Sequence, residues 1–429
     1  MVLWSSIINV PDLAVDFFEN DTPHGYAKRF MWMRHLQAFV GKTQSCQLNT
    51  IIYDGFAGAG VYSNAWDEDI AKYGSPLIAI RVSIEHFITK GKLINRFNAR
   101  ASIEVGPNDG VADYRMTNYS IRVYLVEGNI SNFNKLVKNV GIIFDLYAIK
   151  FIRKKRSTDC VEIFSADDSI SISCRVSHEK FENVDPPHIF SSDRLVAFID
   201  PFGYKHIPMS HVSKFVGLRK EIYINYMSQF VNRFFNVDEE GVQKLFGMAK
   251  ADIESRLLPY TSDRLDNGMA LYKDILKEHC GTEAFALSFE MRNIYNTRLY
   301  HMIFISCHEK GLEVMKEAMN AGTQNPTCFA LSDFLISKKG QKMNLRNGQK
   351  DEDVAPVIFE RFKSNQSVSI KTVRNFVIHD TIFVWRKGTL KNLCVNNKIT
   401  NVLSAAGQHP QRRGTFPDHT EWFLTFAAS

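Results

Sequence analysis

Cysteine is sparse in this 429-residue chain, and no two of its cysteines form a C-x-x-C pair. The seven are odd in number and scattered: Cys46, Cys160, Cys174, Cys280, Cys307, Cys328 and Cys394. This spacing argues against a zinc site or a disulfide framework. It predicts buried, reduced thiols in a cytoplasmic protein.

Long apolar runs are absent as well. No stretch reaches the roughly 18 residues that a membrane-spanning helix needs. The first residues, MVLWSSIINVPDLAVDFF, include acids before an apolar segment of signal-peptide form develops. We therefore expect neither secretion nor a membrane span.

The chain also lacks a strong excess of one charge. Lys and Arg number 52 against 46 Asp and Glu, which leaves a formal charge of +6. Such a balance permits a polyanionic partner without requiring one. With 45% hydrophobic and 23% charged residues the composition is that of a globular protein, and the length suits one full-sized core plus a second small domain.

Strand and helix patterns alternate over the first three quarters of the chain. Nearly continuous apolar runs that end on an acid, such as IRVYLVE and LVAFID, are typical of strands buried on both faces. Helical patterns occupy 25–40 and 75–87. The remaining strand patterns cover residues 51–54, 169–176, 221–226 and 298–306. Together they predict an α/β doubly wound sheet of mostly parallel strands.

The predicted organisation has two domains and a linker. Residues 1–324 form the α/β domain, with an N-terminal helix and two long surface loops, 92–119 and 150–159. Residues 325–353 are polar and charged, which is typical of a linker or flexible loop. In 354–429, helical patterns are followed by a hairpin, which is the outline of a winged-helix domain.

The stretch IIYDGFAGAGVY places an acid and three glycines directly after a strand. Asp54, Gly55, Gly58 and Gly60 have the spacing D-G-x-x-G-x-G, with Phe56 inserted. Glycines there would let the backbone pass close to a nucleoside while its amides stay free to donate. The pattern departs from G-x-G-x-x-G and lacks the lysine of a P-loop, so neither a dinucleotide enzyme nor a P-loop NTPase is favoured. A simple strand-to-helix turn is the alternative.

Two further strands end on acids. Ligands of open α/β sheets bind at the carboxyl ends of strands, where Glu127 could accept hydrogen bonds from ribose hydroxyls. Asp200, followed by Pro201 and Phe202, could present a carboxylate, a carbonyl and a ring to a planar amine. The alternative for Asp200 is an N-cap in a turn.

The motifs DGFAGAG, GSPLIAI, AFIDPFG and HMIFISCHEKGLEVMKEAM, in this order, resemble the three-Cys-motif partner protein family. The similarity runs from about Lys28 to Met319 and continues more loosely to the end of the chain. It implies a Rossmann-like class I S-adenosylmethionine-dependent methyltransferase fold with a winged-helix-like C-terminal part. It also implies a partner protein that carries the cysteine motif.

The resemblance assigns roles to individual residues. Cofactor-binding residues would be Asp54, Gly55, Phe56, Gly58 and Gly60, with Glu127 at the ribose and Glu179 on the adenine side. Asp200, Pro201 and Phe202 match the family's Asp-Pro-Phe-Gly, and Asn225 and Asn232 would lie on the substrate side. Asp-Pro-Phe-Gly is similar to the Asp-Pro-Pro-Tyr of amino-methyltransferases, with the aromatic residue one place earlier.

These patterns favour methyl transfer from S-adenosylmethionine to an amino or ring nitrogen of a nucleobase, in which Asp200 and the Pro201 carbonyl orient the amine. No metal-ligand spacing or Pro-Cys pair suggests another chemistry. Basic segments at 150–156, 338–350 and 411–413 could neutralise nucleic acid phosphates. The alternative is a non-catalytic scaffold that keeps the fold to bind a partner protein or nucleic acid.

Overall fold

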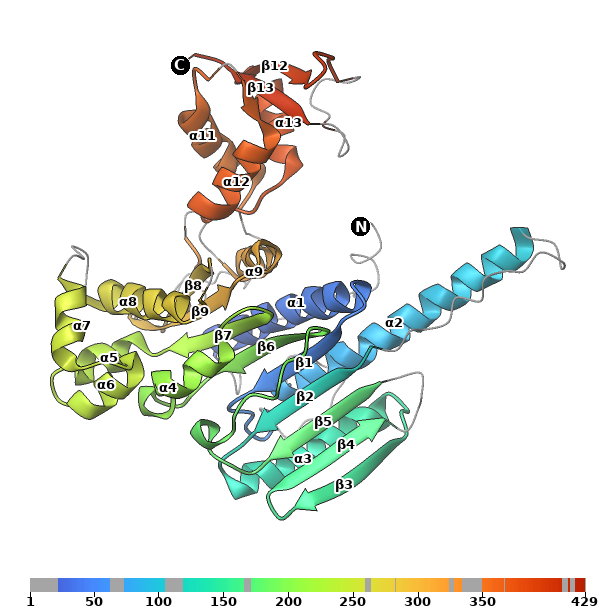
Figure 1. Ribbon diagram of the computed structural model, residues 1–429, viewed down its shortest axis with the longest axis vertical. Helices are drawn as coiled ribbons and strands as arrows, with labels where there is room; N and C mark the ends of the chain where they lie inside the picture. The colour runs from blue at the N-terminus through green and yellow to red at the C-terminus, as the bar shows by residue number, and fades with distance from the viewer. Residues whose placement is uncertain are drawn as a thin grey trace.

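A large sheet with helices on its faces and a separate C-terminal unit make up the part of the chain that the computed structural model describes (Figure 1). The described residues are 22–61, 73–104, 119–165, 171–258, 264–281, 283–323, 328–333, 349–365, 367–410, 416 and 421–428. Within these residues the fold is of the α/β class, with a mixed central sheet.

The large sheet has ten strands in the order β10-β8-β9-β7-β6-β1-β2-β5-β4-β3. Strands β7, β6, β1, β2 and β5 run parallel, whereas β9 runs antiparallel to both β7 and β8. The hairpin β3–β4 extends the other edge, antiparallel to β5. The strands are β1 (Asn49–Asp54), β2 (Ile121–Val126), β3 (Phe151–Ser157), β4 (Cys160–Ser165), β5 (Ile172–Ser177), β6 (Asp193–Ile199), β7 (Lys220–Tyr226), β8 (Phe285–Arg292), β9 (Arg298–Ser306) and β10 (Ala330–Ser332).

Strand order reverses at β1. From β1 the chain crosses to β2 on one side, and it later returns to place β6 on the other side. Such a switch point opens a crevice at the carboxyl ends of the strands, where open α/β sheets bind their ligands. The fold therefore directs attention to the residues that follow β1, β2 and β6.

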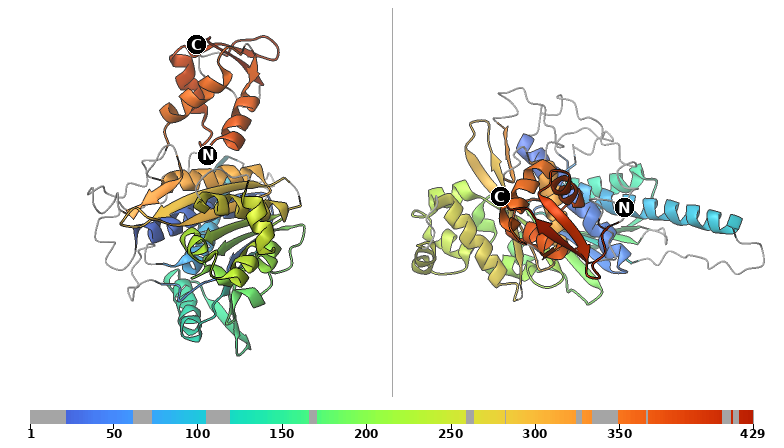
Figure 2. Two further views of the ribbon diagram at one scale, coloured as in Figure 1. Left: turned by 90° about the vertical axis from the view of Figure 1, so that its left-hand side faces the viewer. Right: turned by 90° about the horizontal axis from the view of Figure 1, so that it is seen from above.

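Helices cover both faces of the central strands. Apolar residues of α1, α2, α3 and α9 share one core with the sheet, and residues of α4 to α8 share the other. At the β3–β4–β5 end, α3 packs behind β4 and β5, and their front face is open in the described part of the chain (Figures 1 and 2). The helices are α1 (Pro23–Ser45), α2 (Ser75–Glu104), α3 (Ile130–Leu146), α4 (Met209–Val212), α5 (Ser228–Phe234), α6 (Glu239–Phe246), α7 (Lys250–Leu257), α8 (Arg264–Glu278) and α9 (Glu309–Gly322).

The C-terminal unit has its own core and its own sheet. Three short strands pair antiparallel in the order β11-β13-β12, and three helices pack against them. In chain order the elements are α11 (Asp351–Phe362), β11 (Val368–Ser369), α12 (Ile370–Asp380), α13 (Lys387–Val395), β12 (Ile399–Ser404) and β13 (Trp422–Phe426).

Lys316 of α9 joins the two units. Its side chain is almost wholly buried, and its Nζ donates hydrogen bonds to the carbonyls of Val377 and Ile378 at 3.0 and 2.7 Å and also to that of Thr381. The last carbonyls of a helix have no partner within the helix, so an ammonium group there satisfies them. It also interacts favourably with the negative end of the helix dipole. Arg374 of α12 adds ion pairs at 2.7 Å to two glutamates of α9.

Three segments differ from the sequence-based expectation. Helix α2 continues to Glu104 instead of ending near Phe87, because no proline interrupts it, so residues 92–104 of the predicted loop 92–119 are helical and residues 105–118 lie outside the described residues. Most of the predicted loop 150–159 is strand β3, since its charged residues occupy a sheet edge where they remain solvated. Strand β10 and the start of α11 fall inside the predicted linker 325–353. Residues 338–348 and 411–413 of the predicted basic segments lie outside the described residues.

We expect Lys316→Met to loosen the joint between the two units. It leaves buried carbonyls at the end of α12 without a donor, which typically costs about 1–3 kcal/mol. Urea denaturation should show a destabilisation of this size, and hydrogen exchange should show lower protection in α12. Lys310→Met is the matched control: it removes only an exposed ion pair to Glu313 within the same helix, so it should change both quantities much less. Unchanged protection of α12 in Lys316→Met would contradict this role.

Candidate functional site

Four polar residues gather at the carboxyl ends of neighbouring strands. Asp54 ends β1, Glu127 follows β2, Asp200 follows β6 and Asn225 is the next-to-last residue of β7. Three of them are buried, and Asp200 is partly exposed. Because β7, β6, β1 and β2 are adjacent in the sheet, residues up to 171 positions apart in the sequence reach one edge.

The glycines after β1 are required by the shape of the turn. Gly58 and Gly60 have φ angles of 60° and 85°, in the left-handed region that side chains disfavour. A Cβ on Gly55 would lie 2.7 Å from the ring of Phe181, whereas one on Gly58 would meet nothing within 4 Å. The backbone at Gly58 therefore faces open space, and that at Gly55 is packed.

The carboxylate of Glu127 joins two loops. Its Oε2 accepts a hydrogen bond from the Gly58 amide at 2.7 Å, and its Oε1 accepts one from the Asn129 amide at 2.7 Å. Asn129 in turn caps α3, since its side chain accepts from the Asn132 amide. Glu127 thus orients the glycine turn and the start of α3 at the same time, and each carboxylate oxygen keeps a lone pair for a further donor.

Asp54 is fully buried beneath this turn. Its Oδ1 accepts the Phe56 amide at 3.1 Å, and the Ser75 side chain lies near enough to interact with the carboxylate. Burial raises the pKa of Asp54 to about 7, and the negative charges of Asp200 and Glu127 add to this effect, whereas the Ser75 side chain and the Phe56 amide offset part of it. The side chain therefore changes charge near neutral pH.

Asp200 is held by residues from two other elements. Lys28 of α1 forms an ion pair with its Oδ2, and the Asn225 side chain donates to its Oδ1 at 2.8 Å. The Lys28 ammonium also lies 5.5 Å from the centre of the Tyr300 ring. The Oδ1 atom of Asn225 is buried and has no hydrogen-bond partner among the described residues. Lys28 and Asn225 thus hold the Asp200 carboxylate in place, and the Oδ1 atom of Asn225 can still accept a hydrogen bond.

Phe202 and a nearby hollow offer apolar surface beside Asp200. Pro201 is buried, whereas the Phe202 side chain is 77% exposed. An open hollow of about 260 Å³ begins at Gly203, and Phe230 and Phe234 of α5 contribute to its lining. These two rings are stacked, with centres 6.4 Å apart. Exposed rings of this kind suit contact with a planar group.

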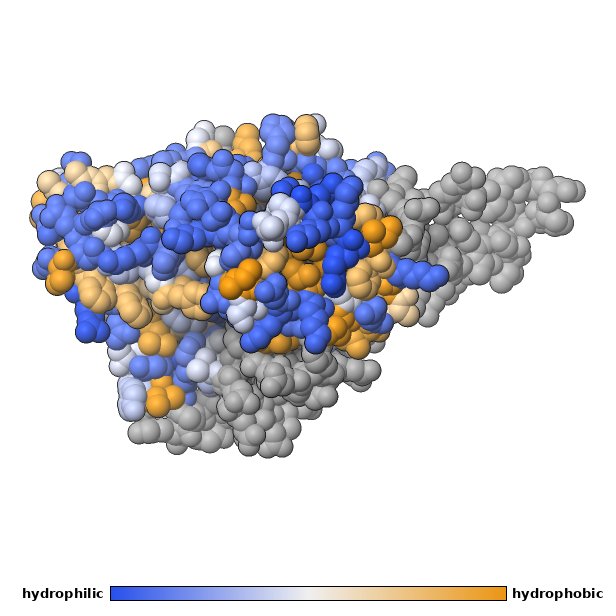
Figure 3. All heavy atoms as spheres, turned by 90° about the horizontal axis from the view of Figure 1, so that it is seen from below, coloured by the Kyte–Doolittle hydropathy of each residue, from blue (hydrophilic) through white to orange (hydrophobic). Residues whose placement is uncertain are grey.

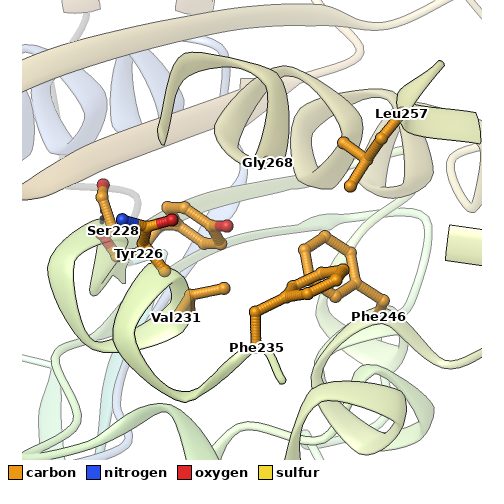
Figure 4. A pocket seen from close by; sticks show the side chains of 8 residues that line it. Tyr226, Ser228, Val231, Phe235, Phe246, Leu257 and Gly268 are labelled. Carbon is orange, nitrogen blue, oxygen red and sulfur yellow. Dashed lines mark hydrogen bonds between the residues drawn. The ribbon is translucent and has the colours of Figure 1, made fainter. Parts of the chain in front are cut away.

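Asn232 does not join the Asp200 cluster. It is exposed and lines a different cavity, of about 10 Å³, between α5 and the helices that follow (Figure 4). That space holds roughly one water molecule. Ser228 also lines it and its hydroxyl lies 2.6 Å from His301 Nδ1, but both side chains are almost wholly buried. This pair resembles part of a hydrolase triad, yet a substrate could not reach the serine.

Glu179 lies near the turn after β2 but is engaged locally. Its carboxylate is exposed and accepts from the Asn183 side chain at 3.0 Å and from the Lys180 amide at 2.9 Å. The Asn183 hydrogen bond is the main cause that lowers its pKa. The main-chain oxygen of Glu179, rather than its carboxylate, is the part that approaches Gly128, since a Cβ added to that glycine would lie 3.7 Å from it.

Sequence reasoning missed two residues of the site. Lys28 belongs to a helix that carries no motif, and Phe181 lies in a short 3-10 helix whose ring packs against Gly55. A lysine on an apolar helix face is a weak signal, because long side chains often reach the surface from such positions. Their roles depend on contacts over 172 and 126 positions, which no local pattern encodes.

Within the described ranges, no group of three or more His, Cys, Asp or Glu side chains could hold a metal ion. Among the same residues, no helix combines the length and the apolar character needed to cross a membrane.

The arrangement defines an α/β protein with a polar site at the switch point of its sheet. No protein-family model matches the chain, and no curated protein sequence does. One similar solved structure is protein LPL1258 from Legionella pneumophila, of family DUF519, at 12% identity over 67% of this chain and 85% of that one, with a TM-score of 0.30. Another is the methyltransferase domain of bacterial CtHen1-CN, at 10% identity over 64% and 99%, with a TM-score of 0.26.

We expect Glu127→Gln to destabilise the site, because an amide NH₂ cannot accept the second backbone hydrogen bond. One of the amides of Gly58 and Asn129 then loses its partner, at a cost of about 1–3 kcal/mol. Thermal or urea denaturation measures this loss. Glu179→Gln, at an exposed carboxylate near the same turn, is the control and should leave the free energy of unfolding nearly unchanged. Equal stability of the two variants would contradict the bridging role.

Proposed function

We propose that this protein transfers the methyl group of S-adenosylmethionine to an amino or ring nitrogen of a nucleobase in nucleic acid. The single observation that carries the proposal is the grouping of Asp54, Glu127 and Asp200 around a glycine turn at the switch point of the sheet. The strand order supports it, because the order reverses at β1, and open α/β sheets bind their ligands at such a switch point.

The residues around the glycine turn fit this cofactor. Asp54 is a buried carboxylate beside the turn, and a Cβ added to Gly58 would meet nothing within 4 Å, so the space there is open. Glu127 keeps acceptor capacity suited to ribose hydroxyls, at the place where Rossmann-type folds use an acid. When bound, S-adenosylmethionine supplies a methyl group activated by a positive sulfonium. A carboxylate at Asp54 would favour a ligand with this charge.

The substrate side would lie at Asp200. Its carboxylate and the Pro201 carbonyl would accept hydrogen bonds from an amine and orient the nitrogen lone pair, so that the rate gain comes mainly from positioning. Lys28 and Asn225 hold the carboxylate in place for this task. The aromatic hollow at Phe230 and Phe234 supports a planar substrate, which must be single-stranded or flipped out of a duplex.

We infer that the C-terminal unit is a winged helix, because its elements follow in the order α11, β11, α12, α13, β12 and β13 and its three strands form one antiparallel sheet. This is the order of helices and strands in that domain. In this domain α13 would be the helix that enters a groove, with Lys387 and Lys391 on it. Arg374 of α12 is less available for nucleic acid, since it is paired with α9. The motif resemblance to the three-Cys-motif partner family adds a cysteine-motif partner protein to the proposal.

The Lys28–Asp200 ion pair favours a second candidate, a non-catalytic scaffold of the same fold. A carboxylate neutralised by lysine is a weaker acceptor for an amine, and Gly203 stands where amino-methyltransferases have an aromatic residue. Calorimetry with S-adenosylmethionine separates the candidates. Absent binding would end the methyltransferase proposal, and binding without turnover would favour the scaffold.

Incubation with radiolabelled S-adenosylmethionine and separate pools of DNA, RNA and protein tests the activity. We expect label in a nucleic acid pool, and Asp200→Asn should reduce it roughly 100-fold while cofactor affinity stays the same, because only the substrate amine loses its orienting acceptor. Asp185→Asn is the matched control, since Asp185 also precedes a proline but is exposed and paired with Lys214. Label in no pool would overturn the proposal.

Cofactor affinity should depend on pH through Asp54. The free protein holds a proton on Asp54 below about pH 7, and a positively charged ligand needs the carboxylate, so binding releases a proton. Affinity should therefore rise on the order of tenfold from pH 5.5 to pH 8, measured by calorimetry in buffers of different ionisation enthalpy. Asp54→Asn should bind weakly at both pH values. A pH-independent affinity in the wild type would contradict this role of Asp54.

The same raised pKa has a consequence for the free protein. Asp54 is protonated more readily when folded than when unfolded, because its usual pKa of 3.8 is raised to about 7. The proton on Asp54 therefore favours the folded state: its contribution to the free energy of unfolding is fully present below about pH 4 and is lost as the pH rises through about 7.

A further inference from the structure

One face of the sheet carries cations and aromatic rings that the site at the strand ends does not use. Because side chains alternate along a strand, Ile121, Val123 and Leu125 of β2 point into the core shared with α2 and α3. The residues between them point to the other face. The register of β2, β5, β4 and β3, together with the Arg156–Glu162 ion pair, places a set of residues on that side, which we name the open sheet face: Tyr124, Arg175, Glu162, Phe164, Ile152, Lys154 and Arg156.

Burial agrees with this alternation in each strand. In β5, Cys174 and Val176 are buried whereas Arg175 between them is exposed. In β3, Arg153 reaches back to the Val137 carbonyl of α3 at 3.4 Å, so its neighbours Ile152 and Lys154 lie on the opposite side. Figure 3 shows the molecule from below, where hydrophilic and hydrophobic residues lie side by side on the surface that faces the viewer.

The charge of the open sheet face is positive. Arg175, Lys154 and Arg156 lie on it with a single acid among the described residues, Glu162, which pairs with Arg156. Glu162 offsets one of the three positive charges. Two aromatic side chains, Tyr124 and Phe164, are partly exposed among them, and Ile152 is 49% exposed.

We propose that the open sheet face binds a single strand of nucleic acid. Cations beside partly exposed rings on a four-stranded sheet suit phosphates and unstacked bases, since rings stack on bases of any sequence. A flat face has no element that could enter a groove of a duplex, so a single strand fits better. The proposal deepens the proposed function, on which it rests in taking nucleic acid as the substrate.

Neighbouring lysines of β3 provide the test. Lys154 points to the open sheet face and Lys155 to the opposite side, so Lys154→Gln and Lys155→Gln remove the same charge from the same strand on different faces. Fluorescence anisotropy of the full chain with a labelled single-stranded oligonucleotide, as RNA and as DNA, measures the dissociation constant between 50 and 200 mM salt.

Lys154→Gln should raise the dissociation constant on the order of fivefold at 50 mM salt and reduce the salt slope by about 0.7. Lys155→Gln should leave both nearly unchanged. Glu162→Gln should tighten binding, because it removes an acid from the face. Equal effects of the two lysine variants, no binding by the wild type, or equally tight binding of a duplex would overturn the proposal.

Calorimetry with S-adenosylmethionine on the same variants distinguishes this proposal from the proposed function. If the protein binds the oligonucleotide through Lys154 but does not bind the cofactor, the proposal for the open sheet face stands and the methyltransferase proposal is overturned. If it binds the cofactor but not the oligonucleotide, the methyltransferase proposal stands and the proposal for the open sheet face is overturned.

Discussion

The hydrogen bonds from two backbone amides to the carboxylate of Glu127 are the constraint on which the site depends. They tie the glycine turn after β1 to the start of α3, across 69 positions of sequence on one side and 2 on the other. Because Gly58 has its amide turned toward Glu127, the turn adopts left-handed angles that only glycine tolerates well. Asp54 lies buried beside this turn, and burial is the main cause that raises its pKa to about 7, with smaller contributions from the charges of Asp200 and Glu127.

Much of the α/β region follows from local patterns. The apolar runs that end at Asp54 and Asp200 are strands buried on both faces, as their composition predicts. The run that ends at Glu127 is a strand of the same sheet, but Arg122 and Tyr124 on one of its faces are only partly buried, so the expectation of burial on both faces was wrong there. The glycine spacing indicated a tight backbone after β1, and the positive φ angles of Gly58 and Gly60 agree. The partnership of Asp200 with Asn225 could be anticipated in outline, since both lie at the ends of adjacent parallel strands. The roles proposed for these residues in binding and catalysis remain predictions.

The features that escaped prediction depend on contacts far apart in sequence. Nothing near Lys28 indicates that it meets Asp200, because helix α1 must first pack on the sheet. The charged stretch of β3 resembles a solvated loop, since an edge strand exposes most of its side chains and shows no apolar run. Strand β10 is only three residues long and pairs with β8, too short for any periodicity to appear. In each case tertiary packing, rather than local preference, decides the structure.

The hairpin β3–β4 and the joint at Lys316 stand at distant places on one sheet. Helix α9, which carries Lys316, packs against β8 and β9, and seven strand spacings separate β9 from β3. At about 4.8 Å for each spacing the two places are offset by roughly 34 Å along the sheet. Side chains at such a separation share no partner, so substitutions at the β3 edge and at Lys316 should change the free energy of unfolding independently of each other.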